Sequence, residues 1–352
     1  MDLQNIRSTI DQIDDQLLRL LHRRMEYALR ARKQKVQLTD PQREEQVFRN
    51  VIDRATGLLE YSFVSSLFES IIEQSKQVQQ KGLKLVAFQG EHGAWGEIAS
   101  RSLGPDMVPV PCKEFVDVFD GVVAKEFDFG VVPVENSIEG GVNEVNDLLI
   151  ETDVRIAGEI RLPIHQNLLV IPGSDYRELK LVYSHPQALA QCRAFIRRTK
   201  LDPRPFYDTA GAARWLAQER PQASAAIASS LAAKLYGLEV VKENIEDHPQ
   251  NMTRFVVIVH RDSQQTGDKC TIVFSTAHRS GSLYNVLKTF AENLINLTRI
   301  ESRPVRQQPG TFAFLVDFLG DEGGENVRNA LRLLELQAEN LKVLGFYPEA
   351  SQ

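Results

Sequence analysis

The sequence predicts a multidomain protein with three regions of different fold class: all-α over residues 1–81, two-lobed α/β over 83–261 and α+β over 270–350. Three observations predict this division. Residues 1–80 contain one glycine and one proline and keep the apolar spacing of helices throughout. After Lys81, short apolar runs alternate with helix-like stretches, as in α/β domains with a largely parallel sheet. The last region follows the strand, helix, strand, strand, helix, strand order of a ferredoxin-like domain.

The composition is that of a globular protein without a basic surface for nucleic acids. Of the 352 residues, 43% are hydrophobic and 25% charged, and the formal net charge is -6. No run of lysine and arginine occurs, and no apolar stretch approaches the length of a membrane span. The three cysteines lie far apart without a CxxC pair, which indicates neither a disulfide framework nor a zinc site. We therefore expect a cytoplasmic protein with no metal and no nucleic-acid or membrane partner.

The first region is expected to form three helices, separated at "LTDPQ" and "TGLLEYS". On an ideal helix, with about 100° per residue, the first helix carries an apolar stripe. This stripe is formed by Ile6, Ile10, Ile13 and Leu17. Arg24 and Lys35 fall in the middle of the stripe, with Arg7 at its edge. Cations would ordinarily lie on the opposite, polar face, so these positions need an explanation.

The other two helices also carry polar groups on their apolar sides: Asp40 and Glu44 on the second, Ser75 and Gln79 on the third. An interhelical network of ion pairs would explain any single misplaced charge. Together, however, the cations outnumber the carboxylates, and a dry core with excess positive charge is costly. The cations are Arg7, Arg24, Lys35 and Arg43, and the carboxylates are Asp40 and Glu44. A small bound anion would balance the charge, and because so short a bundle encloses little volume, we expect a homodimer in which Arg7 reaches the partner's site.

The phrases "IRSTIDQIDDQLLRLLHRRM", "ARKQK" and "IIEQSKQVQQ" resemble the all-helical chorismate mutases over essentially all of residues 1–80. The resemblance implies rearrangement of chorismate to prephenate, in which arginines hold two carboxylates in the reactive conformer. It implies that Lys35, Gln79 and Glu44 are catalytic, with Lys35 and Gln79 donating to the ether oxygen where negative charge develops. The implied substrate-binding residues are Arg7, Arg24, Asp40, Arg43 and Ser75.

In the α/β region, polar clusters follow several expected strands. "FGVVPVENSIEGG" leads through a Gly-Gly pair into a helix, where backbone N–H groups can face an anion, although such a pair is more often a plain turn. "YSHPQ" and "NMTRF" place Ser184 and Thr253 at other strand ends. Because ligands bind outside the carboxyl ends of strands in α/β sheets, these clusters favour one shared cleft between two lobes.

The phrases "VVPVENS", "YSHPQ", "YGLEVV" and above all "NMTRF" resemble prephenate dehydratase over residues 83–260. The resemblance implies a periplasmic-binding-protein-like fold and loss of water and carbon dioxide from prephenate to give phenylpyruvate. It assigns catalysis to Thr253, which we expect to donate to the departing ring hydroxyl, and to Arg254, which would hold a carboxylate or order the loop. The implied substrate-binding residues are Glu135, Asn136, Ser137, Ser184, Gln191, Asn251 and Phe255. Asp208 in "YDTAGAA" is a further candidate.

In the last region, "GSL" at a helix start and "LTRIESRP" in the next strand resemble two motifs of the ACT regulatory domain of phenylalanine-inhibited dehydratases. A glycine at a helix start can bring backbone N–H groups to an amino-acid carboxylate. The implied effector-binding residues are Gly281, Ser282, Leu283, Glu301, Ser302, Arg303 and Pro304. The alternative is a plain ferredoxin-like dimerisation module.

Together, the resemblances imply one bifunctional enzyme of phenylalanine biosynthesis with feedback inhibition by phenylalanine and no metal or organic cofactor. The expected assembly is a homodimer or a higher homo-oligomer. Two alternatives remain open. The chain could be a monofunctional prephenate or arogenate dehydratase with a helical dimerisation arm, or a non-catalytic amino-acid sensor.

Overall fold

The computed structural model describes residues 3–34, 40–55, 57–305 and 311–350. It divides into two compact units, the first comprising residues 1–85 with 105–108 and the second residues 86–104 with 109–352. Within the described ranges, no helix is long and apolar enough to cross a membrane.

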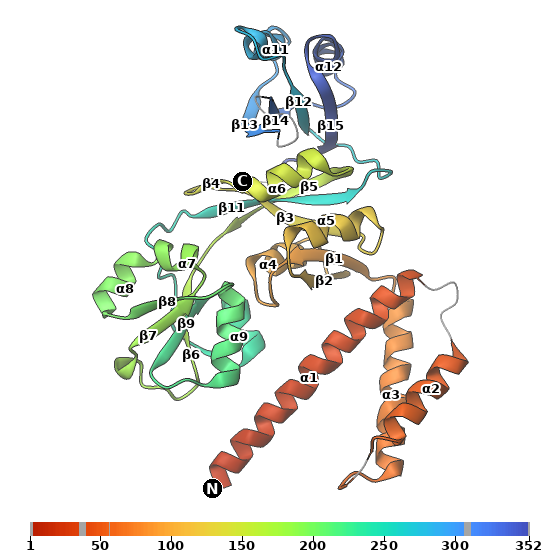
Figure 1. Cartoon of the computed structure of the whole chain (residues 1–352), viewed down its shortest axis with the longest axis vertical. Helices are drawn as coiled ribbons and strands as arrows, with labels where there is room; N and C mark the ends of the chain where they lie inside the picture. Colours follow the sequence, from red (N-terminus) through yellow and green to blue (C-terminus); the bar gives the residue numbers. More distant parts are fainter. Residues whose placement is uncertain (1–2, 35–39, 56, 306–310, 351–352) are drawn as a thin grey trace. The chain divides into compact units, whose positions relative to one another are not determined.

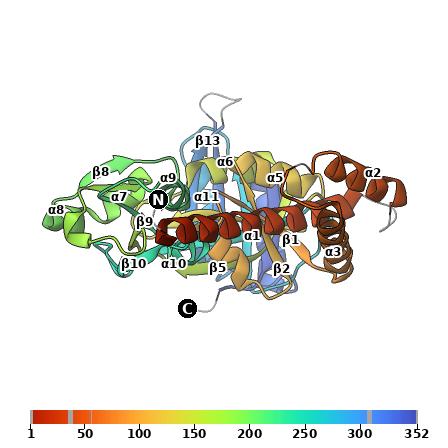
Figure 2. The ribbon, with the colours of Figure 1, turned by 90° about the horizontal axis from the view of Figure 1, so that it is seen from below.

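The first unit contains the three expected helices. These are α1 (Leu3–Gln34), α2 (Pro41–Ile52) and α3 (Tyr61–Gln80). Asp40 is the N-cap of α2 and accepts a hydrogen bond from the Arg43 amide at 3.0 Å, so the helix begins where the sequence places an aspartate before a proline. The C-terminal half of α1 packs on α3 through Leu29 and Ile72, whereas its N-terminal half diverges from α3 (Figures 1 and 2).

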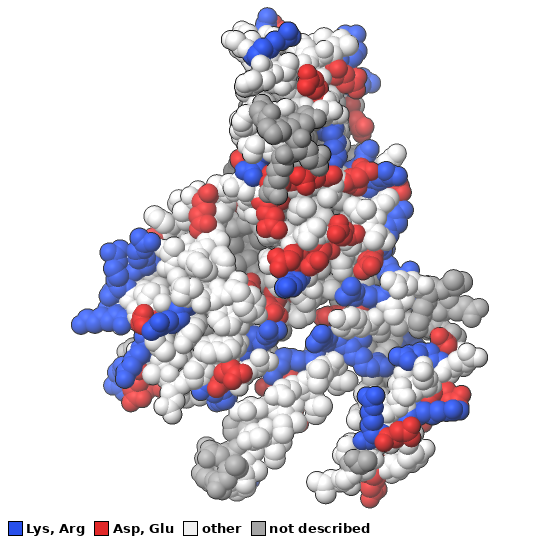
Figure 3. Space-filling view, in the orientation of Figure 1, with Lys and Arg blue, Asp and Glu red and all other residues white. Residues whose placement is uncertain are grey.

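The N-terminal half of α1 exposes its apolar stripe. Ile6, Ile10, Ile13 and Leu17 are between 42% and 53% exposed. The face of this helix that Figure 3 shows is largely uncharged. The predicted amphipathic pattern is therefore present, but a single chain leaves the stripe in water, where burying it would stabilise the protein.

The second unit begins with a lobe built on a mixed sheet in the order β2-β1-β3-β11-β5, with β4 paired to β3. Its strands are β1 (Lys84–Gln89), β2 (Met107–Cys112), β3 (Phe129–Asn136), β4 (Gly140–Gly141), β5 (Val154–Pro163) and β11 (Met252–His260). Its helices are α4 (Trp95–Ser102), α5 (Phe115–Val123) and α6 (Asn143–Glu151).

A second lobe is inserted between β5 and β11, with sheet order β10-β6-β9-β7-β8. Its strands are β6 (Asn167–Val170), β7 (Leu181–Ser184), β8 (Asp202–Pro205), β9 (Ser224–Ala228) and β10 (Glu239–Lys242). Its helices are the short η1 (Tyr176–Glu178), α7 (Pro186–Gln191), α8 (Arg193–Thr199), α9 (Thr209–Glu219) and α10 (Ser230–Tyr236). The two-lobed architecture expected from the sequence is confirmed.

The expectation of largely parallel strands is wrong in part. β3 is parallel to β1, and β7 is parallel to β8 and β9. However, β11 runs antiparallel to both β3 and β5, and β6 runs antiparallel to β9 and β10. The chain returns from the second lobe into the middle of the first sheet, and this reversal is a tertiary feature that local alternation of strands and helices does not encode.

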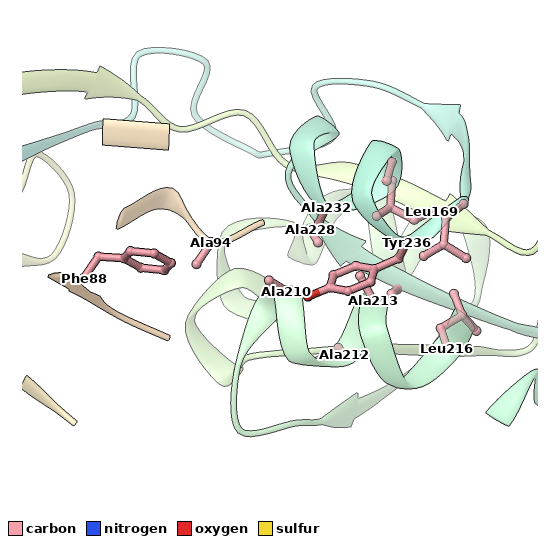
Figure 4. Packing of buried hydrophobic residues seen from close by; sticks show 13 residues of the cluster. Phe88, Ala94, Leu169, Ala210, Ala212, Ala213, Leu216, Ala228, Ala232 and Tyr236 are labelled. Carbon is pink, nitrogen blue, oxygen red and sulfur yellow. The ribbon is translucent and has the colours of Figure 1, made fainter. Parts of the chain in front are cut away.

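The two lobes share part of their packing. Phe88 and Ala94 of the first lobe pack with an alanine-rich core formed by α9, α10 and β9 (Figure 4). The loop between β1 and α4 approaches α10 so closely that a Cβ at Gly93 would lie 2.7 Å from the Ala232 Cα. Gly93 also has φ +93°, a conformation that side chains rarely adopt, so only glycine fits this contact.

The remaining residues of the second unit form the expected βαββαβ module. Its elements are β12 (Lys269–Ser275), α11 (Ser282–Glu292), β13 (Leu297–Pro304), β14 (Phe312–Leu319), α12 (Glu325–Gln337) and β15 (Glu339–Tyr347). The antiparallel sheet has the order β13-β14-β12-β15, and both helices pack on one face through a core that includes Phe290 and Phe318. This is the ferredoxin-like topology that the element order predicts.

Candidate functional sites

In the helical unit, three of the predicted residues meet between α1 and α3. The guanidinium of Arg24 donates to the hydroxyl of Ser75 and, at 3.5 Å, to the carbonyl of Ile71. Gln79 donates to the carbonyl of Ala28 at 3.0 Å, which leaves its buried Oε1 without a partner among the described residues. Burial lowers the pKa of Arg24 from its ordinary value. An ammonium or guanidinium held by neutral groups is a favourable site for an anion.

The other predicted residues of this unit lie apart from Arg24 or have other partners. Glu44 forms an ion pair with Lys76 at 2.9 Å, one residue beyond Ser75. The exposed Arg43 side chain donates to Gln46. Arg7 is exposed on the free half of α1. Lys35 lies outside the described residues.

In the second unit, a cavity of about 300 Å³ lies between the two lobes. Its walls include Asn136, Gln191, Thr253 and Phe255, four of the predicted residues, together with Asp208. Further lining residues were not predicted as site residues: Gln89, Trp95, Gln166, His185, Tyr207 and Thr209 among others. Gln89 and Trp95 lie in "AFQGEHGAW", a phrase with the same strand-to-helix pattern as the predicted motifs, so a signal for them was present.

The geometry around Asn136 fixes the direction of a hydrogen bond to Thr253. The Oδ1 of Asn136 accepts from the backbone N–H groups of Ile138 and Glu139 at 3.0 and 3.2 Å. Its Nδ2 must therefore face the other way, where it donates to Thr253 Oγ1 at 3.0 Å and to Asn251 Oδ1 at 2.7 Å. Because the Thr253 oxygen accepts from Asn136, its own hydrogen is available to another acceptor.

A second group of hydrogen-bonded polar side chains lies along the cavity wall. Gln191 donates to the carboxylate of Glu139 at 3.0 Å, and Gln166 donates to Gln191 Oε1 at 3.3 Å. Since Glu139 can only accept when ionised, the orientation of both amides follows from it. This group holds Glu139, in the loop after β3, against α7 and the segment before β6.

Asp208 is the N-cap residue of α9, and the pKa of its carboxyl group is shifted. It caps the helix by accepting from the Gly211 N–H at 2.7 Å. Burial, and to a lesser degree the neighbouring Glu91, raise the pKa of Asp208 above its ordinary value. Glu91 in turn accepts from Tyr207 at 2.9 Å and from Arg214 at 2.8 Å, which joins the two lobes beside the cavity.

Two helices of the first lobe begin at the cavity without a capping side chain. Ala94 precedes α4 and Val142 precedes α6, and neither provides a side-chain hydrogen bond to the first turn. Uncapped N–H groups and the positive end of a helix dipole favour a bound anion. No lysine or arginine is among the residues that line the cavity in the described ranges.

Several predicted substrate-binding residues do not line the cavity. Ser184 is buried and donates to the Ile227 carbonyl at 2.6 Å, so it joins β7 to β9. Ser137 accepts from the Met252 N–H, and Asn251 is fully buried behind Asn136. Glu135 points away from the cavity and pairs with Arg299 at 3.2 Å. These residues support the site or lie outside it.

Of the two roles expected for Arg254, holding a carboxylate or ordering the loop, its position does not fit the first. Successive side chains of a strand point to opposite faces, so Thr253 and Phe255 face the cavity whereas Arg254 points away from it. Its guanidinium is 5% exposed and is held by Glu159 and Asp317 at 2.7 and 2.6 Å. Because side chains alternate along a strand, "TRF" places Arg254 on the face away from the cavity once Thr253 is known to face it.

The predicted effector residues separate into two groups. Gly281 is the N-cap of α11 with φ +86°, and the adjacent Ser282 Oγ is buried without a partner among the described residues. Glu301 lies against Gly141, and Arg303 binds Asp147 at 2.7 and 3.1 Å. The side chains of Glu301 and Arg303 therefore contact the first lobe, and the guanidinium of Arg303 is not available to an effector. Ser302 and Pro304 lie on the other, exposed side of β13, and Leu283 packs against the module's core.

Among the described residues, no cluster of three or more histidine, cysteine or acidic side chains could hold a metal ion.

Comparisons with known proteins cover both units. The family model for chorismate mutase type II matches residues 6–80, and that for prephenate dehydratase matches residues 86–263. A bifunctional chorismate mutase/prephenate dehydratase of Aquifex aeolicus is 36% identical over 360 residues, which cover 99% of this chain and 98% of the relative. Arogenate dehydratase/prephenate dehydratase 2 of Arabidopsis thaliana is 40% identical over 75% of this chain and 72% of its own length.

Among solved structures, prephenate dehydratase from Arthrobacter aurescens in complex with L-Phe matches with a TM-score of 0.70 and 31% identity, over 75% of this chain and 89% of that one. The two family models thus account for the helical unit and for the two-lobed part of the second unit, and the whole-chain relative joins them in one polypeptide. The chain therefore belongs to the bifunctional chorismate mutase/prephenate dehydratases, which rearrange chorismate to prephenate and convert prephenate to phenylpyruvate.

Proposed function

We propose that the interlobe cavity is the prephenate dehydratase site and that Thr253 donates a hydrogen bond to the departing ring hydroxyl. The observation that carries this proposal is the fixed orientation of the Asn136 amide. Its Nδ2 donates to the Thr253 oxygen, so the hydrogen of the Thr253 hydroxyl is directed to another acceptor. In the reaction, the bond from the ring to its carboxylate breaks and its electron pair makes the ring aromatic. The hydroxyl on the opposite carbon leaves as hydroxide, which takes a proton from solvent to become water. A donor at that oxygen lowers the barrier because negative charge develops there.

The carboxylates of prephenate would be bound by backbone N–H groups. The uncapped starts of α4 and α6 supply these donors, and the cavity wall offers no lysine or arginine in the described ranges. Burial raises the pKa of Asp208 above that of an ordinary aspartate. Turnover of prephenate and of arogenate, measured side by side, identifies the preferred substrate.

Asn136→Asp tests the polarity of this site. Aspartate keeps the shape and the bonds to the Ile138 and Glu139 amides, but its second oxygen accepts from Thr253 instead of donating to it. The hydroxyl hydrogen is then drawn away from the substrate, and dehydratase kcat is expected to fall by about tenfold or more. Ser184→Ala is the matched control, since Ser184 is buried at a strand end but bonds only within the second lobe. Formation of phenylpyruvate measures both variants, and equal loss in the two would contradict the proposal.

We also propose that the helical unit becomes a complete mutase site in a homodimer. A second copy of α1 is the occupant that fits the exposed stripe of Ile6, Ile10, Ile13 and Leu17, because the stripe lies on the same face of α1 as Arg24, which contacts α3. Arg24 and the unpartnered Gln79 Oε1 then lie at the end of this interface. The partner would bring Arg7, which is exposed in one chain, to the anion held by Arg24.

For the C-terminal module, we propose an ACT domain that binds phenylalanine. The strand register puts the end of β12 and the end of β13 beside the same residue, since Ser275 and Arg303 both pair with Ala313. "GSL" and "ESRP" therefore lie toward the same end of the sheet. The first turn of α11, which no side chain caps, and the unpartnered Ser282 hydroxyl suit an amino-acid carboxylate.

Gly281→Ala is expected to weaken phenylalanine binding by about tenfold, because a side chain at φ +86° costs roughly 1–2 kcal/mol and shifts the first turn of α11. Gly323→Ala is the control in the same module, since a Cβ there meets no atom and φ is not in the left-handed region. Calorimetric titration of both variants with L-phenylalanine measures the change. Wild-type affinity in Gly281→Ala would place the effector elsewhere.

A further inference from the structure

A buried cluster of charges joins β11 to the C-terminal module. Arg254 of β11 lies at its centre, with Nε 2.7 Å from Glu159 and Nη2 2.6 Å from Asp317 of β14. The same guanidinium donates to the Tyr347 hydroxyl at 3.3 Å and lies 3.6 Å from Glu135. These contacts bring together strands of the first lobe and of the C-terminal sheet.

The cluster is balanced and closed to water. Lys269, at 1% exposure, binds Glu159 at 2.9 and 3.0 Å, so two buried cations face the two buried carboxylates of Glu159 and Asp317. Thr271 donates to the second oxygen of Asp317 at 2.8 Å. Burial alone would lower the pKa of Arg254, but the charge of Asp317 and the other anions raises it above its ordinary value. Removing one partner from such a group leaves an uncompensated buried charge.

On its β3 edge, the pairing of β11 is irregular at this point, so side chains contribute to the position of that edge, whereas the pairing with β5 is regular from Met252 to Val257. The pairing of β11 with β3 shifts register between Arg254 and Phe255. At such a bulge, the ladder hydrogen bonds fix the strand less completely. Thr253, the residue before Arg254, holds its hydroxyl at 3.0 Å from Asn136, and a displacement of β11 would alter that contact.

We propose that Asp317, through Arg254, is a positioning residue for the dehydratase reaction. The C-terminal module is then part of the structure that fixes the position of the Thr253 hydroxyl. The inference rests on the assignment of the cavity and Thr253 to catalysis. Arg254 then acts from the opposite face of its strand, as an anchor, and does not touch substrate. A shift of about 1 Å in a reacting group can cost about 10²-fold in rate, so an anchor of this kind has a measurable effect.

Asp317→Asn in the full-length chain tests the proposal. Dehydratase kcat is expected to fall by about tenfold or more while KM stays within about twofold, because a misplaced donor weakens transition-state binding more than substrate binding. The mutase activity of the same preparation is expected to stay at the wild-type value, which shows that the helical unit is intact, and an unchanged circular dichroism spectrum shows that the second unit is folded. A lower melting temperature with unchanged kcat would indicate a purely structural role and would overturn the proposal.

Asp147→Asn is the matched control. It is the same substitution at the same boundary, but Asp147 binds Arg303 and is attached to α6 instead of β11. Its dehydratase kcat is expected to stay within about twofold of wild type, given that it keeps the Arg254 cluster intact. An equal loss in Asp147→Asn and Asp317→Asn would overturn the proposal, since the effect would then belong to the boundary as a whole.

The double variant Arg254→Gln/Asp317→Asn tests whether the effect of Asp317 depends on Arg254. If Asp317 acts only through Arg254, the double variant is expected to be no slower than Arg254→Gln alone, because both charges leave the cluster together. Losses that multiply would overturn the proposal. Thr253→Val distinguishes the two levels of inference: wild-type turnover in that variant refutes the site itself, whereas its loss together with normal Asp317→Asn turnover refutes only the anchor.

Discussion

Thr253→Val is expected to lower dehydratase kcat by about 10³-fold, within the range of about 10²–10⁴ that a positioned proton or hydrogen-bond donor contributes. Valine has the shape of threonine, so the strand and the cavity wall are preserved. What is lost is the hydroxyl that Asn136 polarises at 3.0 Å. The departing hydroxyl of the substrate would then face a methyl group, and its developing charge would have no donor.

Phenylpyruvate formation measures this loss, and the melting temperature of the variant is the check on folding of the second unit. Thr253→Ser restores the hydroxyl without the methyl group and is expected to recover most of the activity. Dehydratase turnover within about tenfold of wild type in Thr253→Val would exclude Thr253 as the donor.

Arg24→Met is expected to lower mutase kcat/KM by about 10²-fold or more and to leave dehydratase activity unchanged. Arg24 is a half-buried cation of the helical unit, held by Ser75 and the Ile71 carbonyl, and methionine keeps its length without its charge. Catalysis of this rearrangement consists mostly of holding the dianionic substrate in its reactive conformer. Loss of the cation that holds it therefore lowers the rate strongly. Disappearance of chorismate measures the effect, and unchanged mutase activity would refute the assignment.

Mixing variants tests whether the mutase site is shared between copies. Arg7→Ala and Arg24→Met are each expected to be nearly inactive. In a mixed dimer, one site would combine the intact Arg24 of one copy with the intact Arg7 of the other. Random exchange of equal amounts gives mixed dimers for half of the population, each with one intact site, so about a quarter of wild-type activity is expected. No recovery after subunit exchange would mean that Arg7 serves its own chain or none.

The helices and the C-terminal topology could be predicted because their signals are local. Helical spacing and the absence of glycine and proline mark α1 and α3, and the order of strands and helices marks the ferredoxin-like module. The direction of β11 could not be predicted, because its pairing with β3 and β5 depends on where the chain returns from the second lobe.

For the cavity, motif phrases identified Asn136, Gln191, Thr253 and Phe255 among the residues that line it. Ser184 and Arg254 belong to the same phrases but serve other contacts, since neighbouring positions of a strand face opposite sides. Gln166 and Tyr207 reach the cavity through the packing of one lobe on the other, for which a single sequence carries no pattern.

The position of β11 between β3 and β5 also affects how the chain can fold. Residues 164–251 form the second lobe and are synthesised before β11, so β3 and β5 have unpaired edges until residue 260 has left the ribosome. Sheets closed by such distant segments have high contact order and form slowly, and their open edges are prone to pair with other chains. The first lobe, although earlier in the sequence, is therefore expected to be completed after the second and to be the part that depends most on chaperones during synthesis.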